Sequence, residues 1–178
     1  GASPTTFSYA PNADFNGTDS FVVSVSDGTA TDMITVDVNV TNVNDAPVIT
    51  QGDVPLSVTI IEDGNVSWIA SDLNAMDVDS GDILSWGVST VAANGTATVS
   101  GSGASPTTLT YVPDGNFTGS DSFVAQVSDG DLTDAITVNV VVTNVNDAPK
   151  ITQGGPLSVQ MTEDKDDSWS PPYLEAMD

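Results

Sequence analysis

Apolar and polar residues alternate along several stretches of the chain, most regularly in residues 133–143. There, every second position from 136 to 142 is Ile or Val, and most positions between them are Thr or Asn. Successive side chains of an extended strand point to opposite faces, so this pattern predicts a β-strand with one buried apolar face. Residues 34–40 repeat the pattern and predict a second strand of the same kind.

Shorter runs rich in Val, Ile, Thr and aromatic residues predict further strands, and groups containing Gly, Asp, Asn or Pro separate them as turns. About seven short strands in roughly 100 residues are typical of an immunoglobulin-like sandwich. The predicted fold class is therefore all-β, with tandem seven-stranded antiparallel β-sandwiches. The additional strands are expected at residues 56–60, 66–71, 83–91, 96–100, 107–112 and 122–128.

The large aromatic side chains fall within or beside these predicted strands. Such positions favour a place in the core over a ligand platform on the surface. A carbohydrate-binding module, which would use exposed aromatic rings, stays open as an alternative function. The residues expected in the core or at its edge are Trp68, Trp86, Tyr111, Phe117 and Phe123.

The chain contains an internal repeat. The hexamer Asn-Val-Asn-Asp-Ala-Pro occurs at 42–47 and again at 144–149, and about 32 of the 48 positions are identical when residues 1–48 are laid on 103–150. We therefore expect the second half of one repeat in residues 1–43, a complete repeat in 44–145 and the first part of the next in 146–178. This arrangement predicts a window cut from a longer tandem array.

The charge balance of the 178 residues is strongly acidic, with 25 Asp and Glu against 2 Lys and Arg, and neither His nor Cys is present. A net charge of −23 argues against nucleic acid or an anionic membrane surface as a partner. Without His or Cys, the usual zinc, haem and iron–sulfur sites and the Ser–His and Cys–His nucleophiles are excluded. A bound metal would need oxygen ligands, which favours Ca²⁺ over Mg²⁺.

The acidic and Asn residues concentrate at the predicted ends of strands rather than along one face. In the segment 77–82, Asp77 and Asp79 are two positions apart and would lie on one side of an extended chain. Neighbouring carboxylates repel one another unless they stay hydrated or a cation bridges them. Both alternatives stay open at this point: a solvated acidic loop and a cation site.

These motifs resemble the cadherin-like repeats, and most closely the bacterial cadherin-like tandem repeats of large secreted surface proteins and adhesins. The linker NVNDAP is similar to the cadherin linker D-x-N-D-N-x-P, and the segment AMDVDSGD at 75–82 is similar to the cadherin D-x-D segment. IEDG at 61–64 and TEDK at 162–165 resemble the early glutamate motif. The run YVPDGNFTGSDSFVAQVSDG at 111–130 resembles the strand and Asp-containing turn that follow in that family.

The resemblance implies Ca²⁺ at the junctions between repeats. For the second junction, the D-x-D segment would continue beyond Asp178, and Asn in place of several family carboxylates implies fewer or weaker ions. Asp19, Asp82 and Asp121 are reserve ligands for which surface solvation is the expected role. At the first junction the implied ligands are Asn12, Asp14, Asn42, Asn44, Asp45, Asp77, Asp79 and Asp129. At the second they are Glu62, Asp114, Asn116, Asn144, Asn146, Asp147 and Asp178.

The function that the resemblance implies is mechanical and not enzymatic. Ca²⁺ would convert a flexible string of repeats into a stiff stalk of a cell-surface adhesin or matrix protein outside the cell. Its partners would be neighbouring repeats of the same or an identical chain, and glycans or other surface proteins, without membrane insertion. An alternative is an extracellular filament whose subunits complete one another head to tail by strand complementation.

Overall fold

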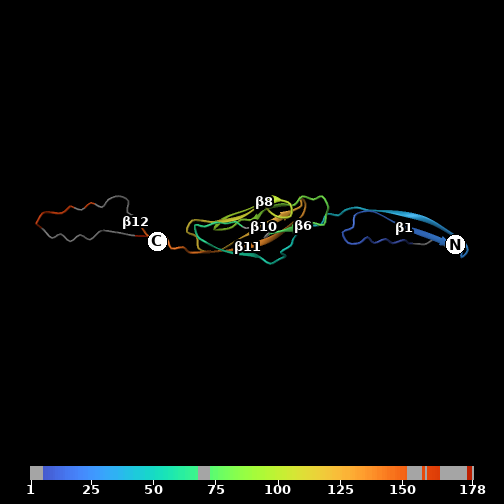
Figure 1. The fold of residues 1–178 in the computed structure, drawn as a ribbon, viewed down its shortest axis with the longest axis horizontal. Helices are drawn as coiled ribbons and strands as arrows, with labels where there is room; N and C mark the ends of the chain where they lie inside the picture. The colour runs from blue at the N-terminus through green and yellow to red at the C-terminus, as the bar shows by residue number, and fades with distance from the viewer. Residues whose placement is uncertain (1–5, 68–72, 152–157, 159, 165–175, 178) are drawn as a thin grey trace.

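The computed structural model describes residues 6–67, 73–151, 158, 160–164 and 176–177. All regular elements in these ranges are β-strands, and none is a helix that could cross a membrane. Figure 1 shows three parts in sequence along the longest axis: a hairpin near the N-terminus, a central body of strands, and a short pair of strands near the C-terminus. The all-β fold class predicted from the sequence is confirmed.

The hairpin consists of β1 (Gly17–Ser26) and β2 (Thr31–Val40), which pair antiparallel over ten residues each. Its turn is closed by Asp27, whose Oδ1 accepts hydrogen bonds of 2.8 Å from the backbone N–H groups of Thr29 and Ala30. In the described residues, β1 and β2 pair only with each other.

The central body contains a seven-stranded sheet with the order β4-β11-β10-β7-β8-β9-β5, and a small separate pair, β3 and β6. Strand β8 pairs with β7 only at the Ser102 end and with β9 along most of its length, so the sheet turns a corner between β7 and β9. The strands are β3 (Val48–Ile49), β4 (Leu56–Ile61), β5 (Val66–Ser67), β6 (Ala75–Met76), β7 (Ser85–Thr90), β8 (Gly95–Ser102), β9 (Thr108–Pro113), β10 (Gly119–Ser128) and β11 (Thr133–Thr143).

The predicted strands are present, with shifted ends. Strand β10 begins three residues before the predicted start, and the run predicted at 66–71 is described only as β5, because residues 68–72 lie outside the described ranges. The short strands β3 and β6, and β12 (Lys150–Ile151) with β13 (Ala176–Met177), were not predicted. Two-residue strands carry no periodic pattern, and these pairs exist only because the chain brings distant segments together.

One feature of the sheet corrects the prediction of a wholly antiparallel sandwich: β4 pairs parallel with β11, over six residue pairs. Both strands therefore run toward the same end of the body. The chain enters near the start of β4 and leaves from the end of β11, so entry and exit lie at opposite ends of the repeat (Figure 1). An antiparallel pair would return the chain to the end at which it entered.

The core lies between the two arms of the folded sheet and is built from the alternating faces that the sequence predicted. Ile136, Val138, Val140 and Val142 of β11 are all at most 3% exposed. The aromatic predictions are confirmed for every residue described: Tyr111, Phe123 and Trp86 are buried and Phe117 packs against them. Trp68 lies outside the described residues.

We predict that Gly101→Ala lowers the free energy of unfolding by about 2–4 kcal/mol, as the sum of backbone strain and overpacking. Gly101 has φ +130°, and a Cβ placed there would lie 2.4 Å from the backbone N of Thr107. Urea unfolding followed by tryptophan fluorescence measures the change.

Gly87→Ala is the matched control, because no atom lies within 4 Å of its Cβ position and its φ needs no glycine. We expect a change within about 1 kcal/mol there. Equal unfolding midpoints for the two variants would contradict this account of the corner between β7 and β9.

Candidate metal centre at the repeat junction

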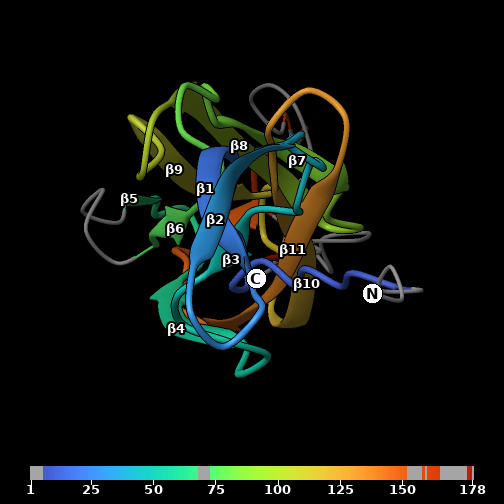
Figure 2. The same ribbon diagram turned by 90° about the vertical axis from the view of Figure 1, so that its right-hand side faces the viewer.

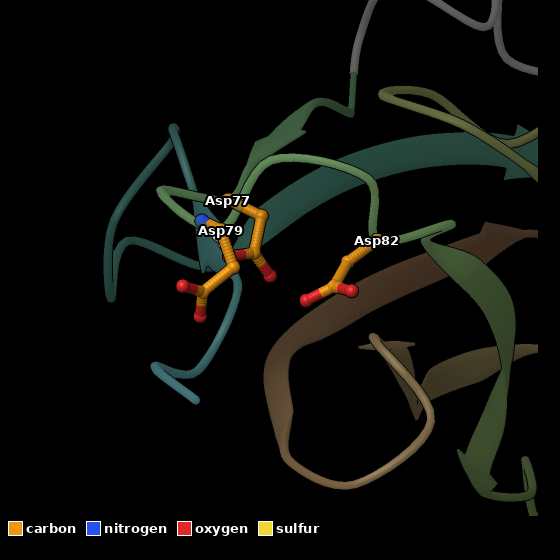
Figure 3. A group of neighbouring side chains, drawn as sticks. All are labelled: Asp77, Asp79 and Asp82. Carbon is orange, nitrogen blue, oxygen red and sulfur yellow. Dashed lines mark hydrogen bonds between the residues drawn. The ribbon is translucent and has the colours of Figure 1, made fainter. Parts of the chain in front are cut away.

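Three carboxylates meet at the entry end of the central body. Each of Asp77, Asp79 and Asp82 places one carboxylate oxygen within 4.8 Å of the others, on the loop between β6 and β7 (Figure 3). Asp79 is only 8% exposed, whereas Asp82 faces solvent. No basic side chain of the described residues forms an ion pair with them. Lys150, the basic residue in those ranges, lies in β12, beyond the exit end of the central body.

The loop backbone fixes the first two carboxylates. The Asp79 N–H donates a 2.9 Å hydrogen bond to Oδ1 of Asp77, an Asx turn of the kind that Asp side chains commonly form. Oδ2 of Asp77 is buried and has no hydrogen-bond partner in the described residues. A buried carboxylate oxygen without a donor is unfavourable, and a bound cation is one way to satisfy it.

Two hydrogen bonds attach the linker to this end of the central body, one of them to the cluster and one to Asp129. The backbone N–H of Asp45 donates to Oδ2 of Asp79 at 2.7 Å, and the side-chain amide of Asn44 donates to Oδ2 of Asp129 at 2.9 Å. Farther along the chain, the Ile49 N–H donates to the Asp134 carboxylate at 2.7 Å. The linker is therefore held against the body on both sides of the β10–β11 loop.

The exit end of residues 1–43 forms a hollow of about 260 Å³, lined by Asn12, Asp14, Asn42 and Asp45 among others. Asp14 adopts a left-handed conformation with φ 59°. Asn42 accepts a 2.8 Å hydrogen bond from the side-chain amide of Asn16. Asp45 lines this hollow, and its backbone N–H donates to the Asp79 carboxylate of the central body. Asp45 therefore connects the two sides of the first junction.

The exit end of the central body forms the corresponding hollow, of about 310 Å³. Glu62 lies at its base, is 2% exposed, and accepts hydrogen bonds from the Asn144 side-chain amide at 2.7 Å and the Val145 N–H at 2.6 Å. The predicted residues that this hollow brings together are Glu62, Asn116, Asn144, Asn146 and Asp147.

Two predicted ligands of the second junction are not found among those lining residues. Asp114 is exposed, and its backbone closes the turn before β10 by hydrogen bonds to Asn94 and from Phe117. Asp178 lies outside the described residues. At the first junction, all eight predicted residues lie either in the hollow or in the hydrogen-bonded cluster.

The electrostatics of the cluster divide its carboxylates into two kinds. Partial desolvation, together with the negative charges of Asp77, Asp79, Asp129 and Asp131, raises the pKa of Asp82 above its ordinary value. The pKa of Asp129 is lowered, first by the hydrogen bond from the Leu132 N–H and then by those from the Asn44 side chain and the Asp131 N–H. Donors stabilise the charge of Asp129, whereas the repulsion at Asp82 is offset by no donor within the described part of the chain.

Three acidic residues make contacts that the sequence analysis did not predict. Asp82 was named as a reserve ligand for which surface solvation was expected; it is exposed, and it also places a carboxylate oxygen in the cluster. Asp121 was also expected at the surface, but it accepts hydrogen bonds from Tyr111 and from two N–H groups of the β7–β8 turn. Asp134, which holds the linker at Ile49, had no sequence signal beyond the repeated Thr-Asp pair at the start of β11 and β2.

Comparison with known proteins agrees with this architecture. The bacterial Ig domain model matches residues 1–39 and 44–141, more than half of the chain. The chain therefore belongs to the bacterial Ig domain family. No curated protein sequence matches the chain.

Among solved structures, a protocadherin gamma B7 fragment of extracellular cadherin domains 1–4 aligns at TM-score 0.53 and 22% identity, covering 87% of this chain and 39% of that one. A protocadherin gamma B2 fragment of domains 1–5 aligns at TM-score 0.52 and 20% identity, covering 80% and 29%. An endo-fucoidan hydrolase aligns at TM-score 0.44 and 18% identity, covering 87% and 24%, too distant for any conclusion on activity. These likenesses concern the fold, and the chain spans at most two fifths of those proteins.

We predict that Asp82 and Asp129 titrate in opposite directions from the ordinary carboxylate pKa of about 3.9. As the pH falls in calcium-free buffer, Asp82 takes up its proton first, because its pKa is raised. The folded state gains stability from Asp82 below that pKa and loses it as the pH rises. Asp129 has a lowered pKa, so its contribution is present above the ordinary pKa and is lost as the pH falls through the lowered value.

Carbon-detected NMR of the side-chain carboxyl carbons measures both titrations in one sample. If Asp82 and Asp129 titrate over the same pH range, the described arrangement of donors and charges is wrong.

Proposed function

We propose that the chain is a segment of an extracellular stalk in which Ca²⁺ at the junctions stiffens consecutive repeats. The observation that carries the proposal is the buried, unpartnered Oδ2 of Asp77 inside a cluster of three carboxylates. The cluster is hydrogen-bonded to Asp45 of the linker, which also lines the hollow of the preceding repeat. One ion at this place would contact residues of both repeats and the linker.

The donor set fits Ca²⁺ well. Calcium takes six to eight oxygen ligands in flexible geometry, whereas Mg²⁺ requires near-octahedral coordination and keeps several waters. The entry side offers carboxylates of Asp77, Asp79 and Asp82, and the linker adds the carboxylate of Asp45 and the amide of Asn44. Because no basic side chain among the described residues pairs with these carboxylates, a divalent cation would lower the repulsion that raises the pKa of Asp82.

The second junction offers the exit-side half of a similar site. Its exit-side hollow is lined by two carboxylates, Glu62 and Asp147, and by three Asn side chains. Amide oxygens are neutral, so each replacement of a carboxylate lowers the attraction for Ca²⁺. The carboxylates of the following repeat would have to complete this site.

Ions bound at the junctions between repeats would stiffen the array because of their position. Because entry and exit lie at opposite ends of the repeat, a junction joins repeats end to end and its bending determines the shape of the array. Without the ion, the carboxylates repel and the linker is the only covalent connection. Extracellular modules bind Ca²⁺ at about 10⁻⁴–10⁻³ M, so such sites would fill outside the cell and not in the cytosol.

A role in an adhesin or matrix protein is the wider context that we propose. Bacterial Ig and cadherin-like domains are typically non-enzymatic repeats of extracellular proteins. The contacts of such a segment would be neighbouring repeats and, at the surface of the cell, glycans or other proteins.

We predict that Ca²⁺ narrows the distribution of angles at the first junction. The chain has no cysteine, so spin labels can be attached at Ser24→Cys in β1 and Thr98→Cys in β8, both exposed. Double electron–electron resonance should give a narrow distance distribution in millimolar Ca²⁺ and a broad one after EDTA. Mg²⁺ at the same concentration should narrow it less.

Asp79→Asn tests the site itself, because it removes one charge from the most buried carboxylate of the cluster. We expect at least about a tenfold loss of Ca²⁺ affinity by titration calorimetry, and a broad distribution at millimolar Ca²⁺. Asp37→Asn removes the same charge from an exposed position in the middle of β2 and should leave both measurements unchanged. The stalk model is refuted if the distribution of the parent chain does not respond to Ca²⁺.

A further inference from the structure

The inward face of the β1–β2 hairpin is an uncovered copy of a buried surface. Ile34 and Val25 are 65% and 70% exposed, whereas their counterparts in the complete repeat, Ile136 and Val127, are 3% and 0% exposed. The counterparts are established by sequence identity and by register, since Phe21 faces Val36 as Phe123 faces Val138. The same apolar surface is thus a core in one place and open in the other.

The two edges of the hairpin are open in the same way. In the complete repeat, β10 pairs antiparallel with β7 and β11 pairs parallel with β4. In the described residues, β1 and β2 have no neighbour on either outer edge. A two-stranded hairpin with an apolar face and two free edges is marginally stable in water, and such edges readily pair with another strand.

The Asp19 carboxylate on the hairpin indicates which hydrogen-bond donors a covering element would provide. Tyr9 stacks on Phe21 at 6.3 Å and donates to Asp19 at 2.7 Å, as Tyr111 stacks on Phe123 at 6.2 Å and donates to Asp121 at 2.8 Å.

In the complete repeat, the Asp121 carboxylate also accepts the N–H groups of Ala93 and Asn94 from the β7–β8 turn, at 3.1 and 2.9 Å. Among the described residues, Asp19 accepts backbone hydrogen bonds only from the adjacent Ser20, so the place of that turn is open.

We propose that the β1–β2 hairpin is a docking face for the first half of a repeat of this same kind, supplied from outside residues 1–178. This partner would place one strand parallel to β2, as β4 lies on β11, and one antiparallel to β1, as β7 lies on β10. Its next turn would donate two backbone N–H groups to Asp19. A second copy of the chain is not the occupant. Its β4 and β7 already cover β11 and β10, and its residues 146–178 repeat only residues 44–77, without a counterpart of β7.

The test supplies the missing half in cis. A duplicate of residues 44–102 is joined ahead of Gly1, where residues 1–6 repeat the sequence of 103–108, so the join reproduces the bond between Ser102 and Gly103. Hydrogen exchange of the β1 and β2 amides should slow at least about a hundredfold, toward the rates of β10 and β11. Exchange in β1 and β2 that does not slow overturns the proposal.

Two charge-matched substitutions in the extended chain separate docking from general effects. Ile34→Asp places a carboxylate on the inward face and should abolish the slowing. Asn39→Asp adds the same charge on the outward face, where the counterpart Asn139 is exposed, and should leave the slowing intact. Equal effects of the two would contradict the assigned face.

Two further measurements exclude other occupants and other causes. Sedimentation of the parent chain over a wide concentration range should show a monomer, and a dimer lost in the Ile34→Asp variant would assign the face to a second copy and overturn the proposal. The exchange experiment is repeated in EDTA. If exchange in β1 and β2 is still slowed in EDTA, the docking does not depend on Ca²⁺. The docking proposal is then tested separately from the stalk model.

Discussion

The excess of negative charge is the constraint on which this structure depends. With 25 acidic and 2 basic side chains, the carboxylates cannot be neutralised by ion pairs, and the protein uses backbone N–H groups instead. Buried or half-buried carboxylates each accept at least one such donor, and the donors come from turns and from the linker. The side chains are Glu62, Asp77, Asp79, Asp121, Asp129 and Asp134. The acidic residues therefore accept hydrogen bonds that hold the turns and the linker in place. Oδ2 of Asp77 is the exception, a buried oxygen that no donor of the described residues reaches.

The two junctions use this chemistry to different extents. At the entry end, the loop between β6 and β7 brings three carboxylates together and the linker supplies an N–H to one of them. At the exit end, Glu62 uses its charge to hold Asn144 and Val145 in place, so one carboxylate already has a structural role. Asn stands at 12 and 42 of the first junction as it does at 116 and 144 of the second, so the difference lies in the three carboxylates of the β6–β7 loop.

Much of the fold could be predicted because the buried face of β11 reads directly from alternation, and the repeated hexamer identifies equivalent positions. The parallel pairing of β4 with β11 could not be predicted, because apolar and polar residues alternate in the same way in parallel and in antiparallel strands. The roles of Asp121 and Asp134 were missed for a related reason: their hydrogen bonds join residues 27 and 85 positions apart. The carboxylate pair Asp77 and Asp79 was found because its ligand spacing is local.

The parallel pair also determines how the repeat would respond to tension along an array. Force applied through the linkers would pull β4 and β11 in opposite directions along their own axes, because one carries the entering chain and the other the leaving chain. The bonds between their six residue pairs would then be loaded in shear and share the load, rather than opening one after another as in an unzipping hairpin. Mechanical strength would thus reside in the body of each repeat, and bending in the junctions between them.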